Sequence, residues 1–313
     1  MADQPTSRRS FLFGRRLLAD DPWSRFLARL KRSCEGGVTL VARESAPMAR
    51  LVPSRPEDVL HALALCRDFK VCMALDGLSL RGPDLSRPVL QVEPGSAWGD
   101  CIPLGHERWR IHAGCRLDVI RGLGFSLLDW EHGLSGSASL AELVAHGPRA
   151  ASPGSLGRFG IEAIELLYPD GTVEILGSFG VADSQPLRSL AAQRSIPLLF
   201  QASNDSDLIH WSQNWDKEGR VSGWPLHYRL DALMHLGDSQ INLAHLLLGH
   251  QGSLGWVLAV HMRLGLDAER LSRHNVQAKG SHKGLAQQVD ATRLDRLVKR
   301  AMDPDGVFMS SPV

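Results

Sequence analysis

The feature that most constrains the fold is a pair of β-rich segments separated by an Asp-Gly turn. Residues 161–168 and 172–176 are rich in apolar residues and flank Pro169-Asp170-Gly171. An Asp-Gly pair between two such segments is a strong signal for a β-hairpin, because glycine accepts the positive φ angle that a tight turn requires. Residues 255–264 are a further long strand candidate. We therefore expect hairpins in the second half of the chain.

The first third of the chain instead alternates strands with helices. Residues 48–52 are expected to form a short strand, and residues 71–75 a buried one. Between them, Pro56-Glu57-Asp58 suits the first turn of a helix, since proline and acidic side chains fit the exposed amides there. Apolar residues at helical spacing continue this helix to Phe69. Together with the later hairpins, this order predicts an α+β fold.

Composition excludes several classes of protein. The 313 residues are 43% hydrophobic and 22% charged, which is ordinary for a globular protein, and a net charge of +1 argues against a general nucleic-acid binder. No apolar run is long enough to span a bilayer. The cysteines are odd in number and form no CxxC pair, so neither a zinc site nor a disulfide framework is expected; they are Cys34, Cys66, Cys72, Cys101 and Cys115. We expect reduced, mostly buried thiols in a cytoplasmic protein.

The N-terminal region carries a segment similar to an export signal. Ser7-Arg8-Arg9-Ser10-Phe11-Leu12 resembles a twin-arginine signal, but residues 14–33 are charged where such a signal needs an apolar segment. Apolar residues at helical spacing between Trp23 and Leu30 instead predict an amphipathic helix with a basic face. We favour a surface helix docked on the domain, with peripheral membrane attachment as the alternative, and we expect a cytoplasmic protein.

The strand at 71–75 runs into a turn with two glycines. The segment reads VCMALDGLSLRG and places six candidate residues at the end of the strand: Asp76, Gly77, Leu78, Ser79, Leu80 and Gly82. Glycine allows close approach of the backbone, and consecutive amides with a serine hydroxyl can bind phosphate oxygens. Strand-turn segments with glycines are common and usually structural. The turn alone is therefore a weak signal for a phosphate site.

The order of these segments resembles the vanillyl-alcohol-oxidase family, whose FAD-binding domain is of the PCMH type. The resemblance runs from the Pro-Glu-Asp helix through the glycine turn to Ile111-His112-Ala113-Gly114. In that family, a glycine-rich loop at this place surrounds the flavin pyrophosphate. Here Asp76 and Leu78 stand where small residues are expected. A carboxylate beside a pyrophosphate is repelled unless it is turned away or paired.

Two later segments extend the resemblance. Residues 134–147, LSGSASLAELVAHG, stand where the family's backbone lies along the flavin, and Gly249-His250-Gln251-Gly252-Ser253-Leu254-Gly255 is similar to its late glycine signature. Gln251 replaces the family's glutamate, and His250 is expected to be a solvated or hydrogen-bonded loop histidine. The resemblance implies further cofactor contacts at Gly136, Ser137, Gly160, Ile161, Gly249 and Gly252.

The end of the chain is similar to the family's closing helix and Asp-Pro-x-Gly turn, at residues 297–307. Relatives place a long substrate-binding cap before this turn, and only residues 265–293 remain for it here. The predicted organisation is a tail and amphipathic helix at 1–45 and an FAD-binding domain of two α+β subdomains at 46–264. A linker and closing segment follow at 265–313, and the cap is largely absent.

The resemblance implies an oxidoreductase that binds FAD without a covalent bond, since no histidine lies in the pyrophosphate loop. The nearest branch is that of D-lactate dehydrogenase and glycolate oxidase, which act on 2-hydroxy acids. No metal site is expected, and the catalytic base stays open among five histidines: His112, His132, His227, His245 and His250. The alternative is a non-catalytic subunit of the same fold, with weakened or lost FAD binding, that binds a partner flavoenzyme. Such a partner subunit would supply the substrate cap or the electron acceptor.

Overall fold

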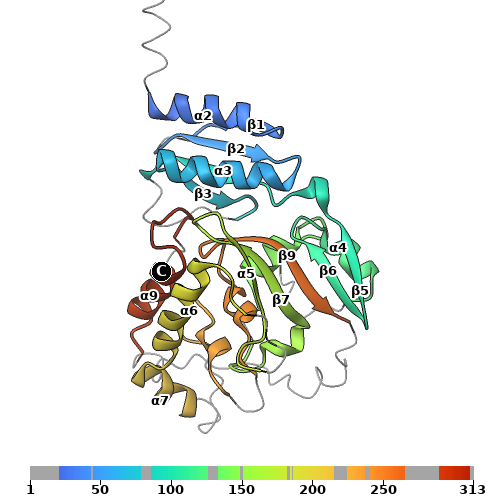
Figure 1. The fold of residues 1–313 in the computed structure, drawn as a ribbon, viewed down its shortest axis with the longest axis vertical. Helices are drawn as coiled ribbons and strands as arrows, with labels where there is room; N and C mark the ends of the chain where they lie inside the picture. Colours follow the sequence, from blue (N-terminus) through green and yellow to red (C-terminus); the bar gives the residue numbers. More distant parts are fainter. Residues whose placement is uncertain are drawn as a thin grey trace, which may run out of the picture.

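The protein, seen in a computed structural model, is an α+β fold built on two separate sheets (Figure 1). The structure describes residues 21–43, 45–78, 86–125, 133–148, 151–181, 184, 186–214, 224–236, 240–264 and 289–310. The smaller sheet and two helices form one end of the molecule, and the larger sheet with most of the remaining helices forms the rest. The predicted α+β class is therefore confirmed.

The smaller sheet has four strands in the order β1-β2-β4-β3. Its strands are β1 (Gly37–Val41), β2 (Met48–Val52), β3 (Cys72–Leu75) and β4 (Val89–Val92). β1 pairs with β2 in antiparallel fashion, whereas β4 lies parallel to both β2 and β3. Because β2 and β3 run the same way, the connection between them must cross over, and α3 (Pro56–Phe69) provides the crossover as the sequence predicted. Strand β1 lies in the range assigned from sequence to the tail and helix, and it was not predicted.

The amphipathic helix near the N-terminus is α2 (Pro22–Ser33), and it packs on α3 rather than standing free. Phe26 and Leu30 are fully buried, and the Phe26 ring meets the Phe69 ring edge-on at 5.9 Å between centroids. Asp58 fixes the connection between the two helices, because its buried carboxylate accepts hydrogen bonds from the amides of Glu35, Gly36 and Ser54. The apolar face that the sequence predicted is thus covered by the domain itself.

The larger sheet is antiparallel throughout, with strands in the order β5-β6-β9-β7-β8. They are β5 (Cys101–Gly105), β6 (Arg108–His112), β7 (Ile161–Leu167), β8 (Val173–Leu176) and β9 (Trp256–Arg263). The predicted hairpin is present as β7 and β8, and Gly171 has a φ of 90° in the turn between them. The predicted late strand is β9, at the centre of the sheet. The edge strand β5 was not predicted.

Helices and 3-10 turns fill the connections. The α-helices are α4 (Leu117–Gly122), α5 (Leu140–His146), α6 (Leu190–Ser203), α7 (Ser206–Asn214) and α9 (Ala291–Met302). The 3-10 turns are η2 (Ser96–Trp98), η3 (Leu156–Phe159), η4 (Leu230–Leu233) and η5 (Leu243–Leu247). Helices α6 and α7 were not predicted.

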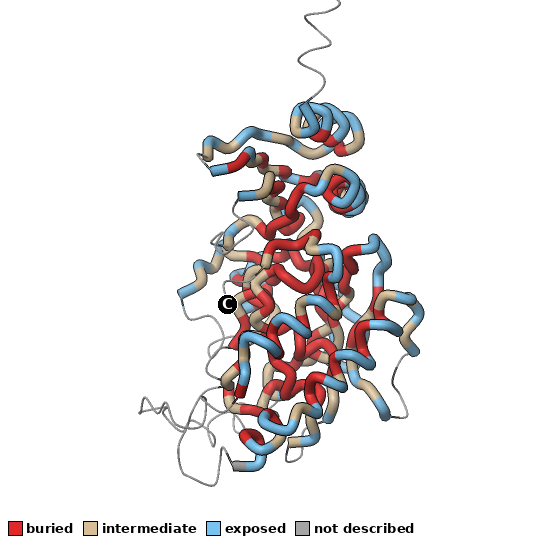
Figure 2. The backbone as a smooth tube through the Cα atoms, turned by 90° about the vertical axis from the view of Figure 1, so that its left-hand side faces the viewer, coloured by how far each residue is buried: buried red, intermediate tan, exposed pale blue. Residues whose placement is uncertain are grey.

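The last described residues return to the smaller sheet. Met73 on β3 donates a hydrogen bond to the Val307 carbonyl at 2.8 Å and accepts one from the Met309 amide at 3.1 Å. Since α9 packs on α6 beside the larger sheet, this segment ties the two sheets together. One hydrophobic cluster includes residues of both sheets, and Figure 2 shows buried backbone running through the length of the molecule. None of the described helices is long and apolar enough to cross a membrane.

Candidate functional site

Three segments that the sequence singled out meet where β3 ends, beside α5. A Cβ built at Gly77 would overlap the Glu142 carboxylate of α5, and one built at Gly252 would lie 3.3 Å from the Leu75 Cβ and 3.5 Å from Leu78 Cδ1. We call this place the junction, and define it as residues 75–78, 139–147 and 249–252. The junction gathers Asp76, Gly77, Leu78, Gly249 and Gly252, five of the predicted cofactor contacts.

The other predicted contacts lie elsewhere or outside the described residues. Gly136 and Ser137 precede α5, where the Gly136 carbonyl accepts a hydrogen bond from the Asp118 amide of α4 at 3.0 Å. Gly160 precedes β7 and Ile161 is its first residue; their carbonyls accept hydrogen bonds from the Arg263 amide and from the His245 ring, respectively. Ser79, Leu80 and Gly82 fall outside the described residues. Among the described residues, no hydrogen bond joins Gly160 or Ile161 to the junction.

Asp76, the departure from the family pattern that matters most for an anionic ligand, is paired. Its carboxylate lies 2.6 Å from Nε of Arg50 on β2, the strand on the far side of β4 from β3. The pairing was not visible in the sequence, because 26 positions separate the two residues. A neutralised carboxylate repels a phosphate far less than a free one. The ion pair therefore removes much of the objection that Asp76 raises.

Glu142 is the carboxylate that remains against the glycine turn. It closes a capping box with Ser139, in which the Ser139 amide donates to Glu142 Oε2 at 2.9 Å and the Glu142 amide donates to the Ser139 hydroxyl at 3.1 Å. Burial raises the pKa of Glu142, and the charges of Asp76 and Glu93 raise it further, against the hydrogen bond from Ser139. Glu142 thus takes up a proton more readily than an ordinary glutamate.

Glu93 completes a group of three carboxylates around the junction. Its side chain accepts hydrogen bonds from the amides of Gly95 at 2.9 Å and Ser96 at 3.1 Å. Two backbone donors at the end of β4 are therefore already occupied by a carboxylate of the protein itself. They are not free to bind a phosphate group unless Glu93 moves.

The late glycine segment also uses its glycines and amides for packing. A Cβ at Gly147, which has a φ of 60°, would overlap the Gly249 amide, so the two backbones touch. The Gly249 amide donates to the Val144 carbonyl at 2.8 Å, and the Gln251 amide donates to Ala145 at 2.9 Å. These bonds satisfy carbonyls at the C-terminal end of α5, which would otherwise lack helical partners. The glycine signature thus has a structural role in holding α5.

The junction fits FAD in some respects and not in others. Its backbone fits, because glycines at positive φ bring three segments close together beside a strand end. The negative charge of Asp76 is compatible with a nearby phosphate, because Arg50 supplies a compensating cation. Glu142 is the residue that is least compatible with a phosphate, since its carboxylate, when ionised, faces the glycine turn. An ionised Glu142 would repel a phosphate group bound at this place.

His250 corrects a prediction made from the sequence. It was expected to be solvated or hydrogen-bonded, but its side chain is buried, with 2% of the residue exposed, and neither ring nitrogen has a hydrogen-bond partner in the described part of the chain. Burial, with the charges of His227 and Lys299, lowers the pKa of His250 to about 3. A neutral, enclosed imidazole fits the packed interior of the loop better than a general base in contact with substrate.

Other histidine candidates make contacts with groups of the protein itself. The His245 ring is buried and shares a hydrogen bond with the Ile161 carbonyl at 3.0 Å; burial lowers its pKa to about 4. The His112 ring bonds to the Trp98 carbonyl at 2.7 Å. His227 stacks edge-on against Tyr228, and His132 lies outside the described residues. The structure singles out no catalytic base among them.

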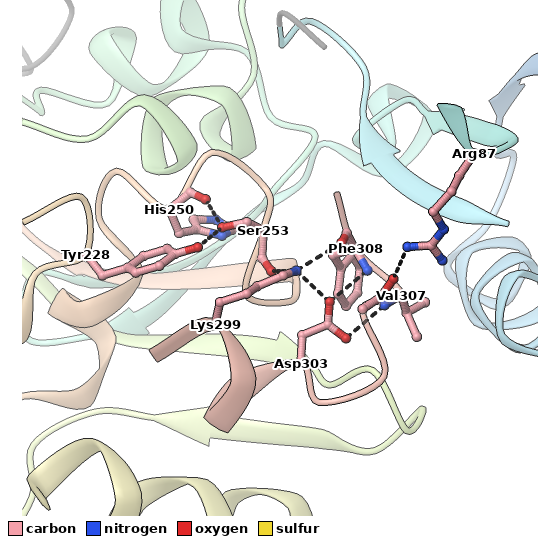
Figure 3. Close-up of polar contacts among 9 residues, drawn as sticks. Arg87, Tyr228, His250, Ser253, Lys299, Asp303, Val307 and Phe308 are labelled. Carbon is pink, nitrogen blue, oxygen red and sulfur yellow. Dashed lines mark hydrogen bonds and ion pairs between the residues drawn. The ribbon is translucent and has the colours of Figure 1, made fainter. Parts of the chain in front are cut away.

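A buried polar network lies behind the late glycine segment and was missed from the sequence (Figure 3). Lys299 of α9 donates hydrogen bonds to the Ser253 carbonyl, the Asp303 carboxylate and the Phe308 carbonyl at 2.6–2.9 Å. Asp303 in turn accepts from the amides of Val307 and Phe308, at 2.9 Å each. The network fastens the closing turn to the 249–255 loop, so the Asp-Pro turn noticed in the sequence has a clear structural role.

Another polar group on β6, β7 and β9 of the larger sheet was also missed. Both oxygens of Glu165 accept hydrogen bonds from Arg110, at 2.5 and 2.6 Å, and Oε1 also lies 2.9 Å from His261 Nε2. Burial alone would raise the pKa of Glu165, but the bonds and charges of His261 and Arg110 lower it to about 2. Among the described residues, no group of three or more His, Cys, Asp or Glu side chains could hold a metal ion.

A pocket of about 240 Å³ lies away from the residues predicted to bind a cofactor. Its walls are mostly apolar and come from α6 and two nearby segments: Phe179, Gly180, Val181, Phe200, His235, Gln240 and Ile241. Phe179 and Phe200 pack together at 5.3 Å between ring centroids. None of the predicted site residues lines this pocket.

Comparisons with known proteins give weak similarities only. No family profile matches the chain, and no curated protein matches it in sequence. Among solved structures, it resembles 4-ethylphenol oxidase from Gulosibacter chungangensis with 14% identity and a TM-score of 0.45, covering 79% of this chain and 43% of that one. It resembles xylooligosaccharide oxidase from Myceliophthora thermophila C1 with 13% identity and a TM-score of 0.41, covering 76% and 42%.

This chain thus spans less than half the length of the two oxidases that it resembles. Likeness at these identities and TM-scores carries no weight for the activity of this chain.

Proposed function

We propose that this chain is the FAD-binding domain of an FAD-linked oxidoreductase of the PCMH type, with the cofactor held non-covalently at the junction. One observation carries the proposal. The turn after β3, the start of α5 and the loop before β9 lie far apart in the sequence, yet they meet at Gly77, Glu142 and Gly252. These are three of the segments that the motif resemblance assigns to the flavin.

The roles of the residues follow from their contacts. Arg50 would offset the charge of Asp76 beside the pyrophosphate, and Gly77 and Gly252 would let the backbone approach it. When bound, flavin carries hydride or electrons, while the protein supplies position and electrostatics. The motif resemblance further favours 2-hydroxy acids as substrates, and we propose these within the broader class. The catalytic base stays open.

A titration of the purified protein with FAD tests the proposal. We expect saturable binding, followed by flavin fluorescence, and release of the bound flavin on mild denaturation. Ser137→Trp places a bulky ring at an exposed position two residues before the junction, on the segment that the motif resemblance places along the flavin, so it should weaken binding without unfolding the protein. Gln201→Trp, at an exposed position on α6, is the matched control and should bind as the wild type does.

A second candidate function is a non-catalytic subunit of the same fold that binds a partner flavoenzyme. The observation that favours it is the charge of the junction, where Glu142 faces the glycine turn and Glu93 occupies two backbone donors. A folded wild-type protein that shows no saturable FAD binding would reject the first proposal and support this one. The partner subunit, the absence of a nucleic-acid ligand and the cytoplasmic location remain predictions from the sequence, as do the domain boundaries.

A further inference from the structure

Two of the five cysteines lie in contact, which their spacing in the sequence did not predict. The sulfur atoms of Cys101 and Cys115 are 3.3 Å apart. Cys101 begins the edge strand β5 and is partly exposed, whereas Cys115 follows β6 and is buried. The contact joins an accessible thiol to an inaccessible one, which is the arrangement of an attacking cysteine and a resolving cysteine.

We propose that Cys101 and Cys115 form a reversible disulfide by exchange with a small-molecule disulfide such as oxidised glutathione. A disulfide bond is about 2.05 Å long, so the two sulfur atoms need to approach by about 1.2 Å, shared between two side chains. Backbone hydrogen bonds already hold Cys115 and Asp100, the residue before Cys101, in place. The His112 amide donates to the Asp100 carbonyl, and the Cys115 amide donates to His112, each at 3.0 Å.

The exchange takes place in two steps, in which atoms and electrons are conserved. The Cys101 thiolate attacks oxidised glutathione, forms a mixed disulfide and releases one glutathione thiolate. The Cys115 thiolate then attacks the Cys101 sulfur, closes the protein disulfide and releases the second glutathione thiolate. Two protein thiols lose two protons and two electrons, and the glutathione disulfide gains the electrons to become two thiols.

The environment makes this exchange slow near neutral pH. Burial raises the pKa of Cys115 to about 12, and burial also raises the pKa of Cys101. The carboxylates that act on the pair, Asp118 on Cys115 and Asp100 on Cys101, raise both values further. Since the thiolate is the reacting form, disulfide formation should accelerate as the pH rises.

The link would join β5 to residues 113–115, which are hydrogen-bonded to the start of α5. The Cys115 carbonyl accepts a hydrogen bond from the Leu140 amide at 2.9 Å, and the Ala113 carbonyl accepts one from Ala141 at 2.8 Å. α5 carries Glu142 at the junction. A disulfide at this place would therefore tie β5 to the segment that supports the start of α5.

Peptide mapping of the full-length wild-type protein tests the proposal. Trypsin cleaves after Arg108 and Arg110, which separates the two cysteines. After incubation with oxidised glutathione at pH 9, we expect a linked pair of peptides containing Cys101 and Cys115, and dithiothreitol should separate them. The oxidised protein should also unfold about 3–6 °C higher, because the link closes a short loop in the native geometry.

Variants make the assignment specific. Cys115→Ser should accumulate a glutathione adduct at Cys101, Cys101→Ser should leave Cys115 unmodified, and the control Cys34→Ser should form the link as the wild type does. No linked peptides at pH 9, a link to Cys34, Cys66 or Cys72 instead, or a link that lowers the unfolding temperature would each overturn the proposal.

Discussion

At the residue scale, the close contact between Gly77 and Glu142 limits what a substitution at Gly77 can show about FAD binding. Gly77 has a φ of 89°, and any side chain there would overlap Glu142. Gly77→Val would therefore disturb packing whether or not FAD binds, and loss of binding in that variant would not identify the loop as a phosphate site. Glu142 is the better residue to change, because the capping box accepts glutamine in place of glutamate.

We predict that Glu142→Gln binds FAD about fivefold more tightly at pH 7, since removing a repulsion of ~1 kcal/mol gives about that gain. The pKa of Glu142 is raised, so its charge is lost as the pH falls toward that value. Wild-type affinity should therefore increase on acidification, while the affinity of the variant changes less. Titrations at several pH values, with Glu57→Gln on the exposed start of α3 as control, measure the effect. Identical affinities at every pH would place Glu142 away from the cofactor.

Arg50 and Asp76 allow a test that separates charge from packing. We predict that Arg50→Met weakens FAD binding about tenfold, because Asp76 loses the cation that lies 2.6 Å from its carboxylate. Removing the carboxylate as well, in Arg50→Met/Asp76→Asn, should restore much of the affinity, and Asp76→Asn alone should increase it. FAD titration of the four proteins forms a double-mutant cycle. Additive effects in this cycle would show that the pair does not act on the ligand together.

At the element scale, local signals predicted some strands and helices and missed others. The Asp170-Gly171 turn and the proline at the start of α3 predicted β7, β8 and α3, because each signal acts within a few residues. β1 and β5 were missed because edge strands, largely exposed here, show little apolar alternation. α6 was missed in a segment that contains Pro197, a residue that disfavours a helix interior.

Glu165 on β7 joins this strand to β6 and β9 of the larger sheet, through Arg110 and His261. Because its pKa is lowered to about 2, its ionised form stabilises the fold at pH values above its ordinary pKa near 4.5, and this contribution is lost as the pH falls toward 2. We predict that Glu165→Gln lowers the free energy of unfolding by ~1–3 kcal/mol at pH 7. Urea unfolding at pH 7 and pH 3.5 should show a smaller difference at the lower pH. An equal difference at both values would contradict the ionic account.

At the scale of the whole molecule, the candidate site could be predicted only in outline. The glycine segments were visible in the sequence because each is a local pattern, and the structure brings three of them together. The partners that set their charge were not visible, because Arg50 lies 26 positions from Asp76 and Glu142 lies on a different segment from Gly77. The packing role of Gly147 against Gly249 was hidden for the same reason.

The closing turn is one of the links between the two sheets, and Asp303 lies at its centre. Its side chain is fully buried, binds Lys299 at 2.6 Å and accepts hydrogen bonds from the amides of Val307 and Phe308. Val307 and Met309 continue as backbone partners of Met73 on β3. Removing the carboxylate would leave the Lys299 ammonium without its ionic partner and release the segment that holds the smaller sheet to α9.

We therefore predict that Asp303→Ala lowers the free energy of unfolding by ~3–5 kcal/mol, the usual cost of breaking a buried ion pair by removing one partner. Asp305→Ala changes an exposed carboxylate two residues away and should cost less than about 0.5 kcal/mol. Urea unfolding followed by tryptophan fluorescence measures both. If the turn couples the sheets, hydrogen exchange at the β3 amides should also accelerate in Asp303→Ala more than at the amides of β7 and β9. Equal acceleration in all three strands would mean that Asp303 supports global stability without joining one sheet to the other.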